Sequence, residues 1–128
     1  TLTYNIFEIT RGFLVAARGG ELTHELLGLE AGDNLRSFAD IADDGEAARQ
    51  DLLAWWAGAG QDADFDAAVP TYYGAQSLHD ILERTAWHTA QHVRQIMFIL
   101  DGLDIIPDGA IGNRELAGLP LPNEVWDG

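Results

Sequence analysis

Two histidines four residues apart, His88 and His92, are the residues of this sequence best suited to chemistry. They lie in a stretch from Ser77 to Leu100 that contains no glycine or proline, and we predict one long helix there. Residues four apart on a helix differ by about 40° around its axis and stand one turn apart, so both imidazoles can reach one point. This spacing is a common way to present two nitrogen ligands to a divalent metal ion.

A pair of core histidines satisfied by hydrogen bonds has the same spacing, and the residues alone leave both explanations open. The helix face that carries the pair is apolar at both ends, at Ile81 and Ile99, so we expect the pair to face the interior. His79 lies about 180° around the helix and cannot join the pair. Thr89 follows His88 at the position where a zinc protease has its glutamate base, which excludes that class.

Helices are expected through most of the chain. We predict long helices over residues 3–18 and 37–57 and a short one over 23–29, and we expect the central helix to stop at Asp101-Gly102. The proline-containing tail, residues 103–128, is expected to wrap back over the bundle. No stretch alternates convincingly between apolar and polar residues, so the predicted class is all-α, with the whole chain forming a single domain.

The composition excludes several classes of protein. Seven arginines face 21 acidic residues, a formal charge of −14, which argues against binding nucleic acid or anionic membrane surfaces. The absence of cysteine excludes a disulfide framework, a cysteine nucleophile and a thiolate metal site, so thiol chemistry would require an external thiol. No apolar run is long enough to span a membrane and no signal peptide is visible, so we expect a cytoplasmic protein.

Three segments resemble the DinB-like superfamily. They are residues 71–96, TYYGAQSLHDILERTAWHTAQHVRQI, residues 116–122, LAGLPLP, and Val125-Trp126-Asp127. The closing segments are similar to a branch whose members are often glutaredoxin or glutathione-transferase fusions to a DinB-like domain. The resemblance implies an antiparallel four-helix bundle, commonly homodimeric, with a Zn or Ni ion held by three histidines. It also implies an S-transferase or isomerase that acts on a small molecule with glutathione, mycothiol or bacillithiol, whose thiol pKa the metal lowers.

The expected metal ligands are His88, His92 and Asn5, with Asn5 standing where the resemblance implies a third histidine. Asparagine is a poor zinc ligand, because zinc prefers nitrogen and sulfur donors. His24 or Glu8 could take its place, or the site could bind no metal.

The resemblance places a further helix before the position of Thr1, so we expect the first helix of the four-helix bundle to be missing or short. We expect a second copy of the chain to cover the side left open, giving a homodimer. A histidine ligand also needs an acceptor for its second nitrogen, and Thr85 and Gln95 are the candidates. Two functions stay open: a metal-dependent enzyme acting with an external thiol, or a degenerate domain without catalysis that serves as a dimeric binding or interaction module.

Overall fold

The computed structural model describes residues 2–27, 32, 35 and 37–126 of the chain, and most of these are helical. In chain order the elements are α1 (Leu2–Ala17), α2 (His24–Leu27), α3 (Phe38–Ala57), the 3-10 helix η1 (Ala59–Asp62), β1 (Ala68–Thr71), β2 (Gly74–Ser77), α4 (Leu78–Gly102) and α5 (Asn113–Leu116). Within these residues, no helix is both long and apolar enough to cross a membrane.

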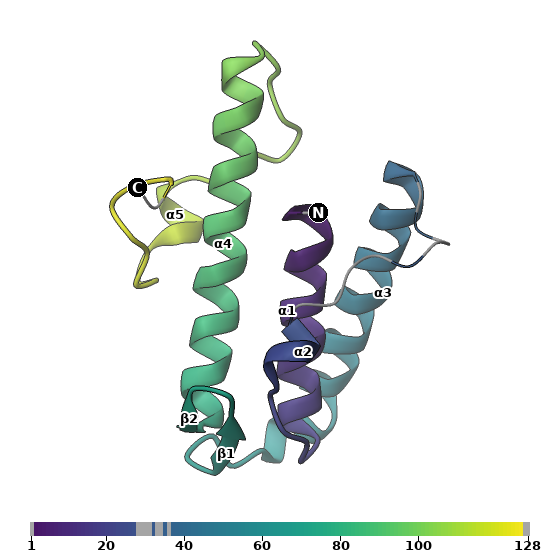
Figure 1. The fold of residues 1–128 in the computed structure, drawn as a ribbon, viewed down its shortest axis with the longest axis vertical. Helices are drawn as coiled ribbons and strands as arrows, with labels where there is room; N and C mark the ends of the chain where they lie inside the picture. The colour runs from purple at the N-terminus through teal and green to yellow at the C-terminus, as the bar shows by residue number, and fades with distance from the viewer. Residues whose placement is uncertain (1, 28–31, 33–34, 36, 127–128) are drawn as a thin grey trace.

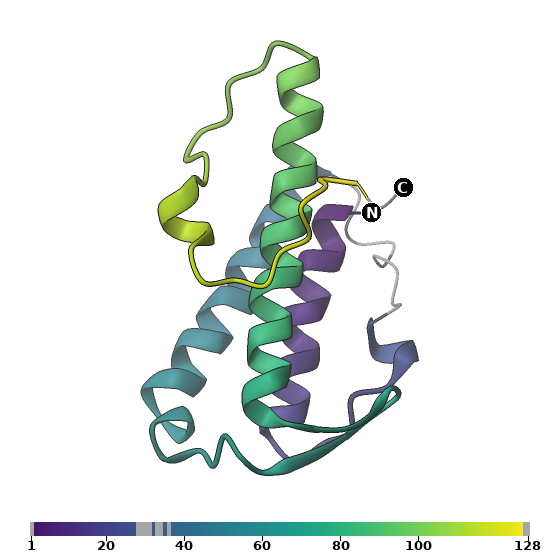
Figure 2. The same cartoon turned by 90° about the vertical axis from the view of Figure 1, so that its left-hand side faces the viewer.

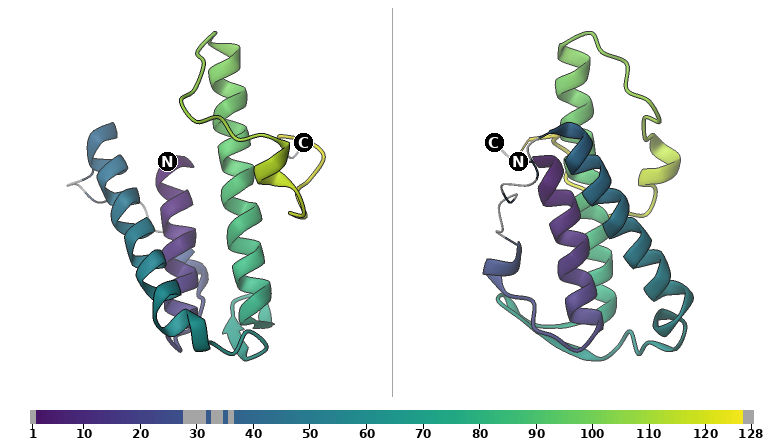
Figure 3. Two further views of the ribbon diagram at one scale, coloured as in Figure 1. Left: turned by 180° about the vertical axis from the view of Figure 1, so that it is seen from behind. Right: turned by 90° about the vertical axis from the view of Figure 1, so that its right-hand side faces the viewer.

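The three long helices lie side by side, with α1 packed against both α3 and α4 (Figure 1; Figure 3). Two ion pairs join α1 to α3, Arg11 to Asp44 and Arg18 to Asp51, and each spans 33 residues. A step of seven residues along α1, from Arg11 to Arg18, matches an equal step along α3, from Asp44 to Asp51. The two helices α1 and α3 therefore run in the same direction, while α4 runs in the opposite one (Figure 1). The predicted antiparallel bundle is therefore wrong for α1 and α3, because the connection between them returns the chain to the end where α1 begins.

A β-hairpin corrects the prediction of an all-α protein. Strands β1 and β2 pair antiparallel from Ala68–Ser77 to Thr71–Gly74, and Gly74 closes the turn with a φ of 110°. The hairpin is tied to the segment after α1, because Leu22 accepts from the Tyr72 amide and donates to the Pro70 carbonyl. Its four-residue strands do not alternate between apolar and polar residues, so the sequence carried no strand signal.

Helix ends follow local capping rules at most positions. Ser37 and Asp40 form the capping box that begins α3, and the Ser77 hydroxyl accepts from the Asp80 amide at the start of α4. The predicted stop at Asp101-Gly102 is confirmed, because α4 ends at Gly102. Helix α4 includes Gly102, and the left-handed residue that follows it is Asp104, with a φ of 56°.

The buried apolar core lies at the hairpin end of the helices. Phe13 of α1 packs edge-on against Trp55 of α3, with ring centroids 5.2 Å apart. Residues from α1, the segment after it, the hairpin and α4 complete the cluster: Leu14, Ala16, Leu22, Val69, Leu78 and Ile81. At about 1.5 Å per residue, the 25 residues of α4 span roughly 37 Å and the 16 of α1 roughly 24 Å, so α4 projects past α1 (Figure 2).

One face of the helices is open and apolar. A hollow of about 440 Å³ lies between α1 and α3, where Ile6 and Phe7 face Leu52. Leu52 also lines a second hollow of about 290 Å³ between α3 and α4, together with Trp56 and Leu82.

The tail returns along one side of α4 and does not wrap the bundle (Figure 2). Its only helix among the described residues is α5, one turn long. The predicted tail that folds back is thus found, but against a single helix, because its contacts come from one side of α4.

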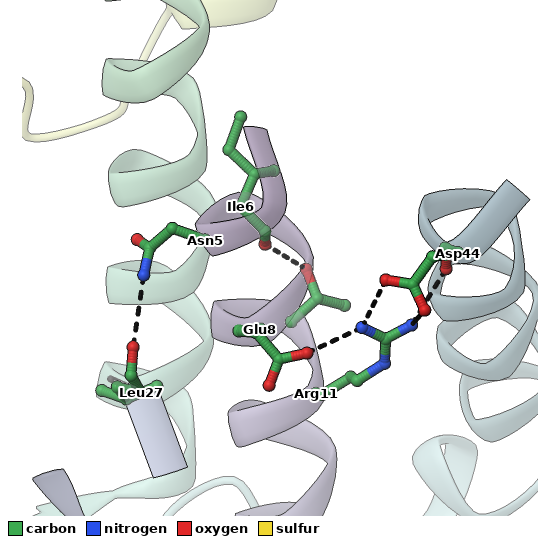
Figure 4. A network of polar contacts seen from close by, with 7 residues as sticks. Asn5, Ile6, Glu8, Arg11, Leu27 and Asp44 are labelled. Atoms are coloured by element: carbon green, nitrogen blue, oxygen red, sulfur yellow. Dashed lines mark hydrogen bonds and ion pairs between the residues drawn. The ribbon is translucent and has the colours of Figure 1, made fainter. Parts of the chain in front are cut away.

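Two ion pairs fix α1 against α3, and Figure 4 shows the one in which Arg11 contacts both Asp44 and the buried Glu8 carboxylate. The Arg11 guanidinium donates to both carboxylate oxygens of Asp44, at 2.7 and 2.9 Å, and to the Glu8 carboxylate at 2.8 Å. The Glu8 side chain is only 5% exposed, whereas the Arg18–Asp51 pair is 50% exposed on both sides.

Replacing these arginines tests how much each ion pair contributes. We expect Arg11→Met to lower the free energy of unfolding by about 2–4 kcal/mol, because it leaves the buried Glu8 carboxylate without its cation. The matched Arg18→Met change breaks an exposed pair and should cost about 0–1 kcal/mol. Urea unfolding of both variants measures the difference, and equal losses would contradict this view of the α1–α3 contact.

Candidate metal centre

The fold brings the two sequence-predicted histidines against the third predicted ligand. His88 and His92 lie on the part of α4 that faces α1, with ring centroids 4.8 Å apart and planes tilted by 34°. Asn5 projects from α1 toward α4, and its Oδ1 lies 3.1 Å from Nε2 of His92. Asn5 and His92 therefore touch, although 87 residues separate them.

Both amides that contact His92 have their orientation set by backbone carbonyls. The Asn5 Nδ2 group donates to the Leu27 carbonyl at 3.2 Å, as Figure 4 shows. The Gln95 Nε2 group donates to the Val125 carbonyl, also at 3.2 Å. Turning either amide over would place its oxygen against a carbonyl oxygen. Each amide therefore presents its oxygen to the imidazole of His92.

His92 thus lies between two acceptors, Gln95 Oε1 at 2.8 Å from Nδ1 and Asn5 Oδ1 at 3.1 Å from Nε2. A neutral imidazole carries one N–H and can satisfy only one of them. A proton on the second nitrogen satisfies the other, and so does a cation held jointly by Nε2 and Oδ1. Two donors at 2.0–2.2 Å from one ion lie roughly 2.8–3.6 Å apart for ligand angles between about 90° and 110°, a range that includes the separation between His92 and Asn5.

His88 supplies a second uncharged imidazole beside His92. Burial, then the neighbouring His92, then Arg84 lower the pKa of His88 from 6.5 to about 4. One of its two ring nitrogens is therefore unprotonated at neutral pH, as metal binding requires. The Nδ1 atom of His88 is buried and has no hydrogen-bond partner among the described residues. An orphaned buried nitrogen next to a histidine between two oxygens is consistent with a bound cation.

The alternative third ligands are engaged elsewhere. Glu8 points toward Arg11 and α3, away from Asn5 in Figure 4. His24 packs edge-on against Tyr72 of the hairpin turn, with ring centroids 5.3 Å apart. In the part of the chain that the structure describes, no three His, Cys, Asp or Glu side chains form a group that could hold a metal. Any ion here would depend on the amide oxygen of Asn5.

Of the two side chains predicted to accept from the second ring nitrogen of a histidine ligand, Gln95 makes this contact and Thr85 does not. The Thr85 hydroxyl donates to the Ile81 carbonyl of its own helix, whereas Gln95 reaches Nδ1 of His92. Sequence reasoning missed that Gln91 and Arg94 share this side of α4 and hold the C-terminal segment. The signal was present as three hydrogen-bonding side chains at positions 91, 94 and 95, a three-to-four spacing on an amphipathic helix.

Comparisons with known proteins leave the chain without an assigned relative. No family model matches the sequence, and neither the curated proteins nor the solved structures contain a significant match.

The lowered pKa of His88 predicts an acid-sensitive contribution to stability. The unfolded chain takes up this proton near pH 6.5 and the folded chain only near pH 4, so stability falls as the pH drops through that window. We expect His88→Gln to remove roughly 1–3 kcal/mol of the wild-type loss, since one pKa unit corresponds to about 1.4 kcal/mol and the ring is partly solvated.

Urea unfolding at pH 7 and pH 4.5 measures this change. The control is His79→Gln, which removes an exposed histidine from the same helix. An unchanged pH dependence in His88→Gln would show that the His88 imidazole is not held neutral by the fold.

Proposed function

We propose that this chain binds a divalent metal ion through His88, His92 and Asn5, as a DinB-like protein that acts with an external thiol. One observation carries the proposal: the Nε2 atom of His92 faces the Asn5 oxygen at 3.1 Å, while Gln95 takes the Nδ1 side at 2.8 Å. A carbonyl acceptor behind a histidine ligand is the usual way to fix its tautomer and ring orientation.

Each of these residues has a separate role in the proposal. His88 and His92 supply nitrogen donors, Asn5 supplies an oxygen donor, and Gln95 orients the His92 ring. When bound, a Zn or Ni ion would act as a Lewis acid and lower the pKa of a coordinated thiol. The chain has no cysteine, so that thiol would come from a small molecule of the glutathione, mycothiol or bacillithiol type. The resemblance to the DinB-like superfamily implies that such a site serves an S-transferase or isomerase acting on a small molecule.

A second candidate is a degenerate DinB-like domain without catalysis, acting as a dimeric binding module. The lack of a third charged or imidazole ligand among the described residues favours it. In that case the second contact of His92 is a hydrogen bond to Asn5 and needs no metal.

Metal content separates the two candidates. We expect about one Zn or Ni per chain in untagged protein and none in the double variant His88→Ala/His92→Ala, measured by elemental analysis. The control His24→Ala/His79→Ala also removes two histidines and should retain the metal. Asn5→His should bind metal more tightly, because it replaces an amide oxygen by a preferred imidazole. A wild-type protein that takes up neither ion after soaking leaves only the second candidate.

We also propose that the chain forms a homodimer through its open apolar face. Phe38 and Trp56 of α3 are 92% and 50% exposed, and Leu53 is exposed on the same helix, whose neighbouring surface is hollowed. Burial of such side chains favours association, whereas the charge of −14 on each copy opposes it.

Salt should therefore strengthen the dimer, because it screens the repulsion between two acidic chains. We expect Leu53→Glu to weaken dimerisation at least tenfold, while Gln50→Glu adds the same charge to α3 away from the hollows and has a small effect. Sedimentation velocity at 0.05 and 0.5 M NaCl measures both effects. A wild-type chain that stays monomeric at high salt and high concentration would disprove the dimer.

A further inference from the structure

The end of the described chain, residues 122–125, lies along α4 as a strap (Figure 1; Figure 2). Gln91 donates to the carbonyls of Glu124 and Val125, at 3.1 and 2.7 Å. Arg94 donates to the carbonyls of residues 122 and 123, at 2.9 and 3.4 Å, and to the Gln91 side-chain oxygen at 2.8 Å. The contacts that Gln91 and Arg94 make with the strap all use its main-chain oxygens. They therefore depend on the position of the strap backbone and not on its side chains.

Gln95 of α4 contacts both the strap and the histidine pair. Its amide nitrogen donates to the Val125 carbonyl at 3.2 Å, and its amide oxygen meets Nδ1 of His92 at 2.8 Å. One planar amide therefore connects the strap to an imidazole whose other nitrogen contacts Asn5. Asn5 in turn donates to the Leu27 carbonyl, so the chain of contacts runs from the strap through α4 and α1 to α2.

We propose that Gln95 is a positioning residue that couples docking of the strap to the orientation of the His92 imidazole. With the strap in place, the Val125 carbonyl holds the Gln95 amide so that its oxygen faces His92. Without the strap the amide can turn or leave, and Nδ1 of His92 loses its acceptor. Coupling of this kind is reciprocal, so a change at His92 must also change how firmly the strap is held.

The metal-dependent part of this inference rests on the proposed function. A cation on Nε2 makes the Nδ1–H group a stronger donor to Gln95 Oε1, and hydrogen bonds in a chain polarise one another. Metal binding should therefore tighten the strap. The coupling between Gln95, His92 and Val125 exists without metal and can be tested separately.

Two substitutions of Gln95, made in the full chain, distinguish the role of its amide oxygen from the role of its amide nitrogen. Gln95→Leu removes both contacts, whereas Gln95→Glu keeps an acceptor for His92 and loses the donor for Val125. Hydrogen exchange of the peptide spanning 117–126, followed by mass spectrometry, reports on the strap. The ¹⁵N shifts of the His92 imidazole report which nitrogen carries the proton, a readout that a purely structural loss does not move.

We expect both Gln95 variants to speed exchange in the strap several-fold. Gln95→Glu should retain the wild-type His92 tautomer and Gln95→Leu should lose it. Gln91→Leu touches the strap but not His92, and it should still shift the His92 signals through Val125 and Gln95. Arg94→Met is the substitute if Gln91→Leu does not fold, and Gln50→Leu on α3 is the control that should change neither readout.

Zn²⁺ alone serves as the ligand probe. In wild-type protein it should slow strap exchange several-fold, and Gln91→Leu should lower Zn²⁺ affinity several-fold. Loosening of the strap in Gln91→Leu with unchanged His92 signals would overturn the coupling, as would unchanged strap exchange in Gln95→Leu. If Zn²⁺ does not bind at all, the proposed function fails. The hydrogen-exchange and ¹⁵N measurements on the metal-free protein then still show whether the strap and His92 are coupled through Gln95.

Discussion

The packing of Phe13 against Trp55 at the hairpin end is the contact on which the rest of the structure depends. It joins α1 to α3, and Ile81 and Leu78 bring α4 into the same buried cluster. Apolar burial supplies the main driving force for folding and has no directional requirement, so it can hold three helices together without specifying the polar contacts farther along. The three long helices are therefore held together at the hairpin end, with α1 between α3 and α4.

The opposite half of the helices is held by polar contacts that do have directional requirements. Arg11 fixes the spacing of α1 and α3 through Asp44, and Asn5 meets His92 across α1 and α4. The same helix therefore presents an ion pair on one side and an amide on the other. Position along α1 decides which neighbour each side chain meets, because successive residues differ by about 100° around the axis.

The chain combines a high negative charge with an apolar face on its helices. Carboxylates spread over the surface favour solubility and oppose association of identical chains, while exposed Phe38 and Ile106, at 92% and 94%, favour burial. If the proposed metal ion binds to the two imidazoles and the amide, it would add positive charge near the middle of α4 and would lower the net repulsion in a chain with a formal charge of −14.

The sequence by itself determined the features that depend on neighbours along the chain. Helix starts at Ser37 and Ser77 follow from side chains that cap amides three residues on, and the shared face of His88 and His92 follows from helical spacing alone. The end of α4 at Gly102 was also predicted from the sequence, although Asp104 and not a glycine takes the left-handed conformation beyond it.

Tertiary structure decided everything that joins distant segments. The parallel direction of α1 and α3, the hairpin tied to Leu22, and the contact of Asn5 with His92 all require chain closures that no local pattern encodes. Gln95 was recognised from the sequence as a possible partner of a histidine, yet its second bond to Val125 depends on the path of the tail. Local hydrogen bonds are specified within a few residues, whereas these contacts form only when the buried core has placed the helices side by side.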